Sequence, residues 1–276
     1  MQNHIIIYLT NKIFRVKNII NNILNIFGIK IQKLDPELKN RLSFDDIYKN
    51  IFKIYNKPII FDIGANQGQS IDRFIRLFNN PIIHAFEPIK FEYENLINKY
   101  KNNKNIILNN FAIGDKDETN VIYVSKKTGN SSFYKINHNS KWLRKRSKQF
   151  NTSPENYAKI KQRVKVTTID KYCKMNNIQN IDLLKIDTQG YEDKVLSGSK
   201  KILKKNIISI IETEIIFDNT YQKYLTFSDL EKFLLPNNYR FCGLNTNNNN
   251  LFEGLVFSAD LMYVNKLKLI LNKNNL

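Results

Sequence analysis

The sequence predicts an α/β fold with a mostly parallel sheet, and three observations lead to this class. Short apolar segments alternate with amphipathic segments of helical period through the middle of the chain. The apolar segments end in polar residues, as at Asp62, Glu87 and Asp187. After the last helical segment, two further apolar segments follow, 239–244 and 259–264. Strands that alternate with helices form a parallel sheet, and their carboxyl ends meet at one edge of it.

The first predicted strand and the turn after it are the most informative stretch of the chain. Residues 59–61 are apolar, Asp62 ends the run, and Gly64 and Gly68 frame a tight turn before a predicted helix over 69–78. Glycine lets the backbone approach a ligand closely, and the first N–H groups of a helix are free to donate hydrogen bonds. This order of strand, turn and helix predicts a nucleotide site at the carboxyl end of the strand.

Polar residues at the ends of the next two predicted strands extend this site. Glu87 ends the second strand, 25 positions after Asp62. A carboxylate accepts two hydrogen bonds from a vicinal diol, and an acid at a similar spacing binds ribose in dinucleotide sites. A lone Glu at a strand end is usually solvated, but its combination with the glycine turn favours ribose binding. Asn110 and Ala112 end a third predicted strand over 106–112, where small or amide side chains suit the border of an adenine ring.

A later apolar strand over 181–186 contains Lys185 and is followed by Asp187. Charged residues suit a buried strand only when they are paired or functional. The alternative to a functional role is a structural Lys185–Asp187 ion pair, but a doubly wound sheet places this strand beside the first, which favours function. The next strand carries Glu212 and Glu214. The sequence predicts no metal, because no cluster of His, Cys and acids demands one, although Asp187 with these two acids keeps one conceivable.

The first turn differs from the Gly-x-Gly-x-x-Gly form of dinucleotide sites, because an acid precedes its first glycine and the third glycine is missing. The pattern resembles that of the S-adenosylmethionine-dependent class I methyltransferases. Five motifs in order resemble, more narrowly, the FkbM family of these enzymes: Phe61–Gly68, Ala85–Pro88, Asn110–Asp115, Thr168–Asp170 and Leu184–Gly198. The resemblance covers roughly residues 58 to 265. One departure is Gln189, where the family usually has an acid.

The resemblance implies a Rossmann-like, seven-stranded, mostly parallel sheet with an antiparallel strand near the C-terminus and helices on both faces. It also implies S-adenosylmethionine as cofactor and methyl transfer to an oxygen, often a hydroxyl of a sugar or natural product. By position, the residues that hold the amino-acid end of this cofactor are Asp62, Gly64, Ala65, Asn66 and Gly68. The resemblance likewise assigns the ribose to Glu87 and the adenine to Asn110 and Ala112.

The expected catalytic residues are those nearest the reactive methyl group. The resemblance places Asp187 there, with Lys185 and Glu192 in support. An alcohol is a weak nucleophile, so a base within hydrogen-bond reach of its proton assists the transfer. Asp187 is the first candidate for this base and Glu214 is the second.

Beyond the predicted core, the chain divides into an N-terminal helical extension (1–57), a methyltransferase domain (58–265) and a C-terminal tail (266–276). An insertion over 125–165 is polar and basic, and a segment of this length between core strands is typical of a lid or a substrate-facing element. Residues 1–30 have helical spacing, which predicts packing on the domain or, alternatively, contact with a membrane surface. No stretch resembles a membrane span or a secretory signal, so we expect a cytoplasmic protein, with peripheral membrane contact as the variant.

The net charge of +18 permits anionic partners. Nucleic-acid methylation is therefore an alternative function, but the sequence lacks the amide-proline-aromatic motif of base amino-methylation and any clear RNA-binding appendage. A degenerate fold that binds partners through its basic insertion is a second alternative. Cys173 and Cys242 have no metal-ligand spacing and are expected to be reduced thiols. The sequence favours an O-methyltransferase that acts on a carbohydrate, glycan or related small metabolite.

Overall fold

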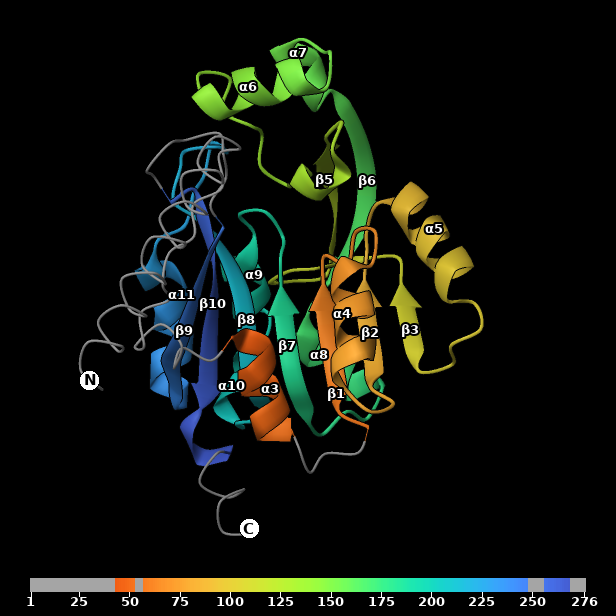
Figure 1. The fold of residues 1–276 in the computed structure, drawn as a ribbon, viewed down its shortest axis with the longest axis vertical. Helices are drawn as coiled ribbons and strands as arrows, with labels where there is room; N and C mark the ends of the chain where they lie inside the picture. The colour runs from red at the N-terminus through yellow and green to blue at the C-terminus, as the bar shows by residue number, and fades with distance from the viewer. Residues whose placement is uncertain (1–42, 53–56, 248–255, 269–276) are drawn as a thin grey trace, which may run out of the picture. The chain divides into compact units, whose positions relative to one another are not determined.

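A computed structural model describes residues 43–52, 57–247 and 256–268. Its main sheet has seven strands in the order β3-β2-β1-β7-β8-β10-β9. Their bounds are β1 (Ile59–Ile63), β2 (Ile82–Phe86), β3 (Ile106–Asn109), β7 (Ile181–Ile186), β8 (Ile208–Ile216), β9 (Tyr239–Asn247) and β10 (Ser258–Asn265). Strand β10 runs antiparallel to both of its neighbours, and the other pairs are parallel (Figure 1). The predicted fold class is confirmed.

Helices cover both faces of this sheet (Figure 1). One face carries α3 (Phe44–Phe52), α4 (Gln69–Leu77) and α5 (Lys90–Tyr100), whose apolar residues share a buried cluster with β1 and β2. The other face carries α8 (Ile169–Met175), α9 (Glu192–Ser197), α10 (Lys200–Lys204) and α11 (Phe227–Leu234), which form a second cluster with the sheet. A 3₁₀ turn, η2 (Leu235–Asn237), follows α11. The two clusters are the hydrophobic core that fixes the positions of the strand ends.

Side chains along each strand alternate between the two clusters, because successive residues of a strand point to opposite faces of the sheet. In β1, Ile60 contacts the α3/α4 cluster, whereas Phe61 and Ile63 contact the other one. Residues Ile60, Leu183 and Ile210 lie in register on three neighbouring strands. Two positions further along, the same register contains Asp62, Lys185 and Glu212. The apolar face under α3 and α4 therefore becomes a charged face near the carboxyl ends of the strands.

A second sheet of three strands lies beside the main one and was not predicted. Its order is β4-β6-β5, with bounds β4 (Ala112–Ile113), β5 (Glu118–Val124) and β6 (Ile160–Thr167). The prediction of one strand over 106–112 is wrong, because β3 ends at Asn109 and Ala112 belongs to the second sheet. The amide of Asn110 donates to the carbonyl oxygens of Glu87 and Pro88, at 2.9 and 3.3 Å, and this turns the chain away from β2.

The segment between β5 and β6 lies beyond the carboxyl ends of the main strands (Figure 1). It contains a 3₁₀ turn, η1 (Thr128–Asn130), and two helices, α6 (Lys141–Gln149) and α7 (Pro154–Tyr157). We call residues 125–159 the cap. Its buried residues Trp142, Leu143 and Tyr157 pack in one cluster with Ile216 and Phe257 of the main domain. Strand β6 begins at Ile160, inside the segment 125–165 that the sequence assigned to the insertion.

Most of the expected N-terminal extension lies outside the described residues, as do the proposed membrane-contacting segment 1–30 and most of the expected tail. Within the extension, α3 is described, and Tyr48 and Phe52 are buried against the sheet. In the described ranges, every helix is too short or too polar to cross a membrane.

Candidate functional site

A cleft of about 450 Å³ opens at the carboxyl ends of the main strands. Its lining includes eight of the residues predicted from the sequence: Gly64, Ala65, Asn66, Glu87, Ala112, Lys185, Asp187 and Glu214. The other four predicted residues, Asp62, Gly68, Asn110 and Glu192, belong to the framework around it. Cap residues close the opposite side of the cleft. Small-molecule sites commonly have volumes of about 300–1,000 Å³, so the cleft has a suitable size for such a ligand.

The turn after β1 brings two strand ends into close contact. Gly64 has a φ of +88°, and a Cβ at this position would lie 2.0 Å from the carbonyl oxygen of Asp187. The backbone N–H of Asp187 donates to the carbonyl of Ile63 at 2.9 Å. Only glycine permits both this φ and this approach. Gly68 serves the packing of α4 on α5, because the Tyr100 hydroxyl donates to its carbonyl oxygen at 2.9 Å.

Glu87 is buried beside this turn, with both carboxylate oxygens bound by backbone donors. The N–H of Asn66 donates to Oε2 at 2.8 Å, and the N–H of Ile89 donates to Oε1 at 2.7 Å. Burial raises the pKa of this carboxyl to about 7, although the two N–H groups favour the ionised form. Each carboxylate oxygen has two lone pairs, so Glu87 can accept further hydrogen bonds from the cleft. Asn110, bonded to the carbonyls of residues 87 and 88, holds this loop in place.

A row of charged side chains lies under α4 at the base of the cleft. Lys185 is buried, and its ammonium group lies 3.1 Å from Oδ2 of Asp187. Asp62 is fully buried on the neighbouring strand, and neither of its carboxyl oxygens has a hydrogen-bond partner in the described part of the chain. Burial raises the pKa of Asp62 to about 6, while the charge of Lys185 opposes this rise. An unpartnered buried carboxyl group is costly, which indicates that Asp62 serves a ligand or an ordered polar contact.

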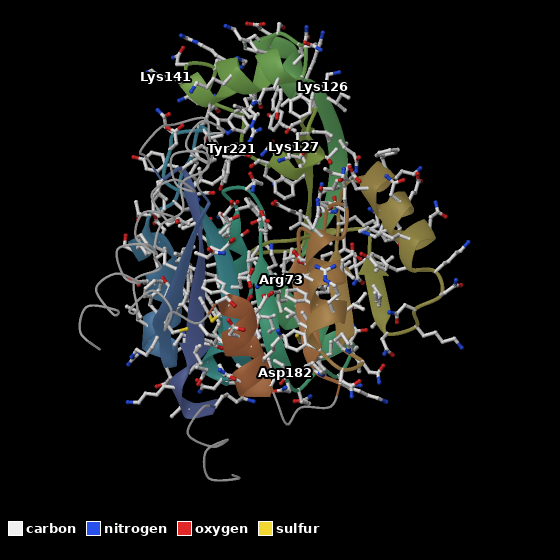
Figure 2. The ribbon with its side chains drawn as sticks, in the orientation of Figure 1. Arg73, Lys126, Lys127, Lys141, Asp182 and Tyr221 are labelled. Atoms are coloured by element: carbon white, nitrogen blue, oxygen red, sulfur yellow. The ribbon has the colours of Figure 1, made fainter. Side chains whose placement is uncertain are left out.

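Glu212 is neutralised by residues that the sequence did not single out. Arg73 of α4 donates to its two carboxylate oxygens at 2.8 and 3.1 Å and also donates to Asp45 at 2.8 Å. The hydroxyl of Tyr48 donates to the same carboxylate of Glu212. Arg73 lies over the middle of the sheet (Figure 2). No local signal marks these contacts, because they join residues that are 139 and 164 positions apart.

Gln189 connects the two candidate bases. Its Nε2 donates to Oδ1 of Asp187 at 3.0 Å and to Oε2 of Glu214 at 2.6 Å. Its Oε1 accepts from the Tyr221 hydroxyl at 2.9 Å, which fixes the orientation of the amide. An acid at this position could not donate to both carboxylates. The departure from the usual family residue therefore has a structural role in this chain.

The two candidate bases have opposite protonation tendencies. Burial alone would raise the pKa of Asp187, but the charge of Lys185 and the hydrogen bonds from Gln189 and Lys185 lower it overall. Burial raises the pKa of Glu214 well above its ordinary value, and the negative charge of Asp187 raises it further. Asp187 is therefore the more readily ionised of the two carboxyl groups, and Glu214 is the more readily protonated. The side chain of Asp187 is 35% exposed, so a ligand in the cleft can reach it.

Glu192 holds the loop that follows Asp187. Its Oε1 accepts from the N–H and hydroxyl of Thr188 at 2.8 and 3.0 Å, and its Oε2 accepts from the N–H of Gly190 at 2.9 Å. Burial raises its pKa to about 7. The position of Gln189 between these two anchored residues depends on Glu192.

Asp260 of β10 also lines the cleft and pairs in register with Glu214. The sequence did not identify it, because the place of β10 between β8 and β9 has no local signal. In the described ranges, no group of three or more His, Cys, Asp or Glu side chains is arranged to hold a metal ion.

The cap contributes both apolar and basic groups to the cleft. Trp142 and Phe257 stack with ring centroids 6.3 Å apart and an interplanar angle of 2°. Lys127 and Arg146 line the same wall. Asn66 donates to the Thr128 hydroxyl at 3.1 Å and joins the cap to the glycine turn. The cleft is therefore enclosed between an acidic sheet edge and a cap rich in donors.

A comparison with models of protein families identifies the kind of domain. The model of the methyltransferase FkbM domain matches residues 62–241. The chain is 24% identical over 180 residues to the 2-O-methyltransferase NoeI of Sinorhizobium fredii (strain NBRC 101917 / NGR234), a match that covers 64% of this chain and 72% of NoeI. The solved structure of methyltransferase FkbM from Methylobacillus flagellatus KT matches at 14% identity and a TM-score of 0.49. That match covers 82% of this chain and 46% of the solved chain, so this chain spans about half of its length.

Proposed function

The chain belongs to the FkbM methyltransferase family, and from this premise we propose that it transfers a methyl group from S-adenosylmethionine to a hydroxyl of a carbohydrate, a glycan or a related small metabolite. The observation that carries the proposal is the ionised, accessible carboxylate of Asp187 at the edge of a cleft that also contains the glycine turn and Glu87. The similarity to a 2-O-methyltransferase supports oxygen as the acceptor atom.

The residues of the cleft suit S-adenosylmethionine in shape and charge. Gly64 lets the turn pack directly against the end of β7, and the unpartnered carboxyl of Asp62 lies in the framework behind it. The accessible carboxylate of Asp187, whose pKa is lowered, favours a positively charged sulfur nearby. We assign the amino-acid end of the cofactor to Gly64, Ala65 and Asn66, the ribose to Glu87, and the adenine to the region of Ala112. Asp62, Gly68 and Asn110 support these groups from the framework behind the cleft. When bound, S-adenosylmethionine supplies a methyl group that is already activated for transfer.

The protein then has two tasks, to position the acceptor hydroxyl and to receive its proton. Alignment accounts for a large part of the rate of such a reaction. Asp187 receives the proton, because it is the ionised member of the pair and lines the cleft. Burial raises the pKa of Glu214 and so favours its protonated form, which can donate a hydrogen bond to the acceptor or to Asp187. Lys185 and Glu192 are positioning residues, since each acts through Asp187 or its loop.

The test of the proposed function has two stages. Calorimetry with S-adenosylmethionine and S-adenosylhomocysteine measures cofactor binding, and we expect saturable binding of both. A labelled methyl donor is then incubated with pools of sugar nucleotides and glycans, and we expect label in a carbohydrate product. Absence of cofactor binding would overturn the assignment of the cleft. Transfer to RNA or DNA and to none of the carbohydrate pools would replace the proposed acceptor class.

We expect cofactor affinity to increase from pH 6 to pH 8. The pKa of Glu87 is raised to about 7, so the carboxyl is mostly protonated at pH 6 and mostly ionised at pH 8. Only the ionised form accepts hydrogen bonds from both ribose hydroxyls. If this form alone binds, the affinity for S-adenosylhomocysteine rises about tenfold over the two pH units. Calorimetry at both pH values measures the change.

Two variants distinguish Glu87 from other acids that titrate in the same range. Glu87→Gln should weaken the binding of S-adenosylhomocysteine and remove the pH dependence of this affinity. Glu192→Gln should keep the dependence, although the pKa of Glu192 is also raised to about 7, because this residue holds a loop. A pH dependence that survives in Glu87→Gln would assign the effect to another group.

We expect Gln189→Glu to shift the acidic limb of the pH–rate profile to higher pH. The new carboxylate would replace an amide that lies 3.0 Å from Asp187 and 2.6 Å from Glu214. A like charge at this distance raises the pKa of Asp187, so the base becomes protonated, and turnover falls, at a higher pH than in the parent protein. The profile of kcat against pH measures this shift. An unchanged acidic limb would contradict the role of Asp187 as the base.

A further inference from the structure

The wall of the cleft that the cap forms contains hydrogen-bond donors without acceptors. Trp142 is 1% exposed and lines the cleft, and its indole Nε1 has no hydrogen-bond partner in the described part of the chain. Arg146 also lines the cleft, and its buried Nε likewise has no hydrogen-bond partner in the described part of the chain. Its Nη1 donates to Gln149 at 3.0 Å. Buried donors of this kind normally have an acceptor. Two such donors on one wall indicate a recognition surface.

These donors are held in place by packing. The Trp142 ring stacks on Phe257 and makes an edge contact with Tyr157 at 5.8 Å between centroids. The Arg146 guanidinium carbon lies 5.7 Å from the centroid of the Trp142 ring. Both side chains belong to α6, whose first turn is capped by the Ser140 hydroxyl, which accepts from the N–H of Leu143 at 3.1 Å. The indole N–H is therefore preorganised.

Lys127 adds a positive charge to the same wall. It lines the cleft, and its charge lowers the pKa of Asp187, so its ammonium group lies within electrostatic reach of the carboxylate. The adjacent Lys126 is exposed and does not line the cleft. Lys127 lies between Arg73 and the helices of the cap (Figure 2). The cap wall thus combines the ammonium group of Lys127 with two further N–H donors, the charged guanidinium of Arg146 and the neutral indole of Trp142.

From this arrangement we propose that the methyl acceptor is an anionic sugar, whose carboxylate or phosphate group is bound by Lys127, Arg146 and the indole N–H of Trp142. The inference rests on the proposed function and specifies its substrate class. Lys, Arg and the indole N–H donate hydrogen bonds and accept none, whereas an ionised carboxylate or phosphate accepts them. The acids Asp187 and Asp260 on the opposite side repel an anion. The same charges therefore orient the sugar, with its anionic group toward the cap and its hydroxyl toward Asp187.

Trp142 allows a direct test, because it is the single tryptophan of the chain. The protein is first saturated with S-adenosylhomocysteine and then titrated with D-glucuronate, D-glucose 6-phosphate or D-glucose, while tryptophan fluorescence is recorded. We expect a saturable change with at least one anionic sugar and a midpoint for glucose at least about tenfold higher, since a charge-assisted hydrogen bond is worth this much. The comparison of D-glucuronate with D-glucose 6-phosphate shows whether the site prefers a carboxylate or a phosphate group.

A matched pair of variants tests the site itself. Lys127→Gln should raise the midpoint for the anionic sugar by about 10- to 100-fold, as expected for one charged contact, and leave that for glucose unchanged. Lys126→Gln removes the same charge one position away and should leave both midpoints unchanged. Trp142→Phe keeps an aromatic ring beside Phe257 but removes the N–H, and calorimetry should then show weaker binding of the anionic sugar.

Four outcomes would overturn the inference. The first is that glucose and the anionic sugars bind equally well, and the second is that Lys126→Gln and Lys127→Gln have equal effects. The third is that Lys127→Gln weakens the binding of S-adenosylhomocysteine and not that of the sugar. The fourth is that no sugar binds the protein loaded with S-adenosylhomocysteine. Failure of S-adenosylhomocysteine itself to bind is a different result, because it contradicts the proposed function and not the choice of acceptor alone.

Discussion

Replacing Asp187 with Asn is expected to lower kcat by about 100- to 10,000-fold, the usual contribution of a general base, and to leave the affinity for S-adenosylmethionine within a few-fold of the parent value. Asparagine has the same shape and can still accept a hydrogen bond from Lys185, but it cannot receive a proton. Single-turnover rates and calorimetry measure the two quantities separately. A kcat within about threefold of the parent value would exclude Asp187 as the base.

Asp182 provides a control on the same strand. It lies at the amino end of β7, far from the cleft (Figure 2), and its carboxylate accepts from the N–H of Ile59 at 2.7 Å. Asp182→Asn changes the same charge in the same strand and can retain this hydrogen bond. We expect its kcat to equal that of the parent protein. Equal losses in the two variants would indicate a general effect of charge on the sheet.

Replacing Gly64 with Ala is expected to destabilise the fold by about 2–4 kcal/mol and to abolish detectable methyl transfer. The new Cβ would lie 2.0 Å from the carbonyl oxygen of Asp187, and the φ of +88° is strained for alanine. Because the obstacle is backbone, relief of the clash must move the end of β7 and with it the Asp187 carboxylate. Thermal unfolding and the transfer assay measure the two effects.

Gly129 is the matched glycine control for this substitution. It also lines the cleft, but a Cβ there would meet its nearest atom, Oδ1 of Asn66, at 3.6 Å, an ordinary contact distance. We expect Gly129→Ala to retain the stability of the parent protein. If Gly64→Ala proved as stable as Gly129→Ala, the close approach of the β1 and β7 ends would not restrict residue 64 to glycine.

The parts of the site that the sequence predicted are those with a local signal. Asp62, Glu87 and Asp187 each follow an apolar strand, and the carboxyl ends of parallel strands meet at one edge, so their neighbourhood follows from the pattern. The FkbM motifs added the identity of the domain. The position of the cleft could therefore be foreseen before any contact was known.

The long-range contacts of the charged side chains could not be foreseen. Arg73 and Tyr48 neutralise Glu212 from helices far away in sequence, and Asp260 reaches Glu214 only because β10 pairs with β8. The second sheet was missed for a similar reason, because the chain leaves the main sheet after Asn109 and Ala112 then pairs with Val166, a residue far away in sequence. Side-chain contacts of this kind depend on the tertiary structure, and strand periodicity carries no information about them.

The place of β10 in the sheet also sets the order in which the site can form during synthesis. Strands β1, β2 and β7 lead into the glycine turn, Glu87 and Asp187, and with β3 they can pair before β10 leaves the ribosome. Until then β8 is an open sheet edge, and β9, which pairs with β10, has no partner in the main sheet. Phe257 and Asp260 line the cleft and arrive with this last strand, so the wall that Phe257 forms with Trp142 is completed only then. The cleft therefore stays incomplete until β10 has been synthesised and has paired with β8.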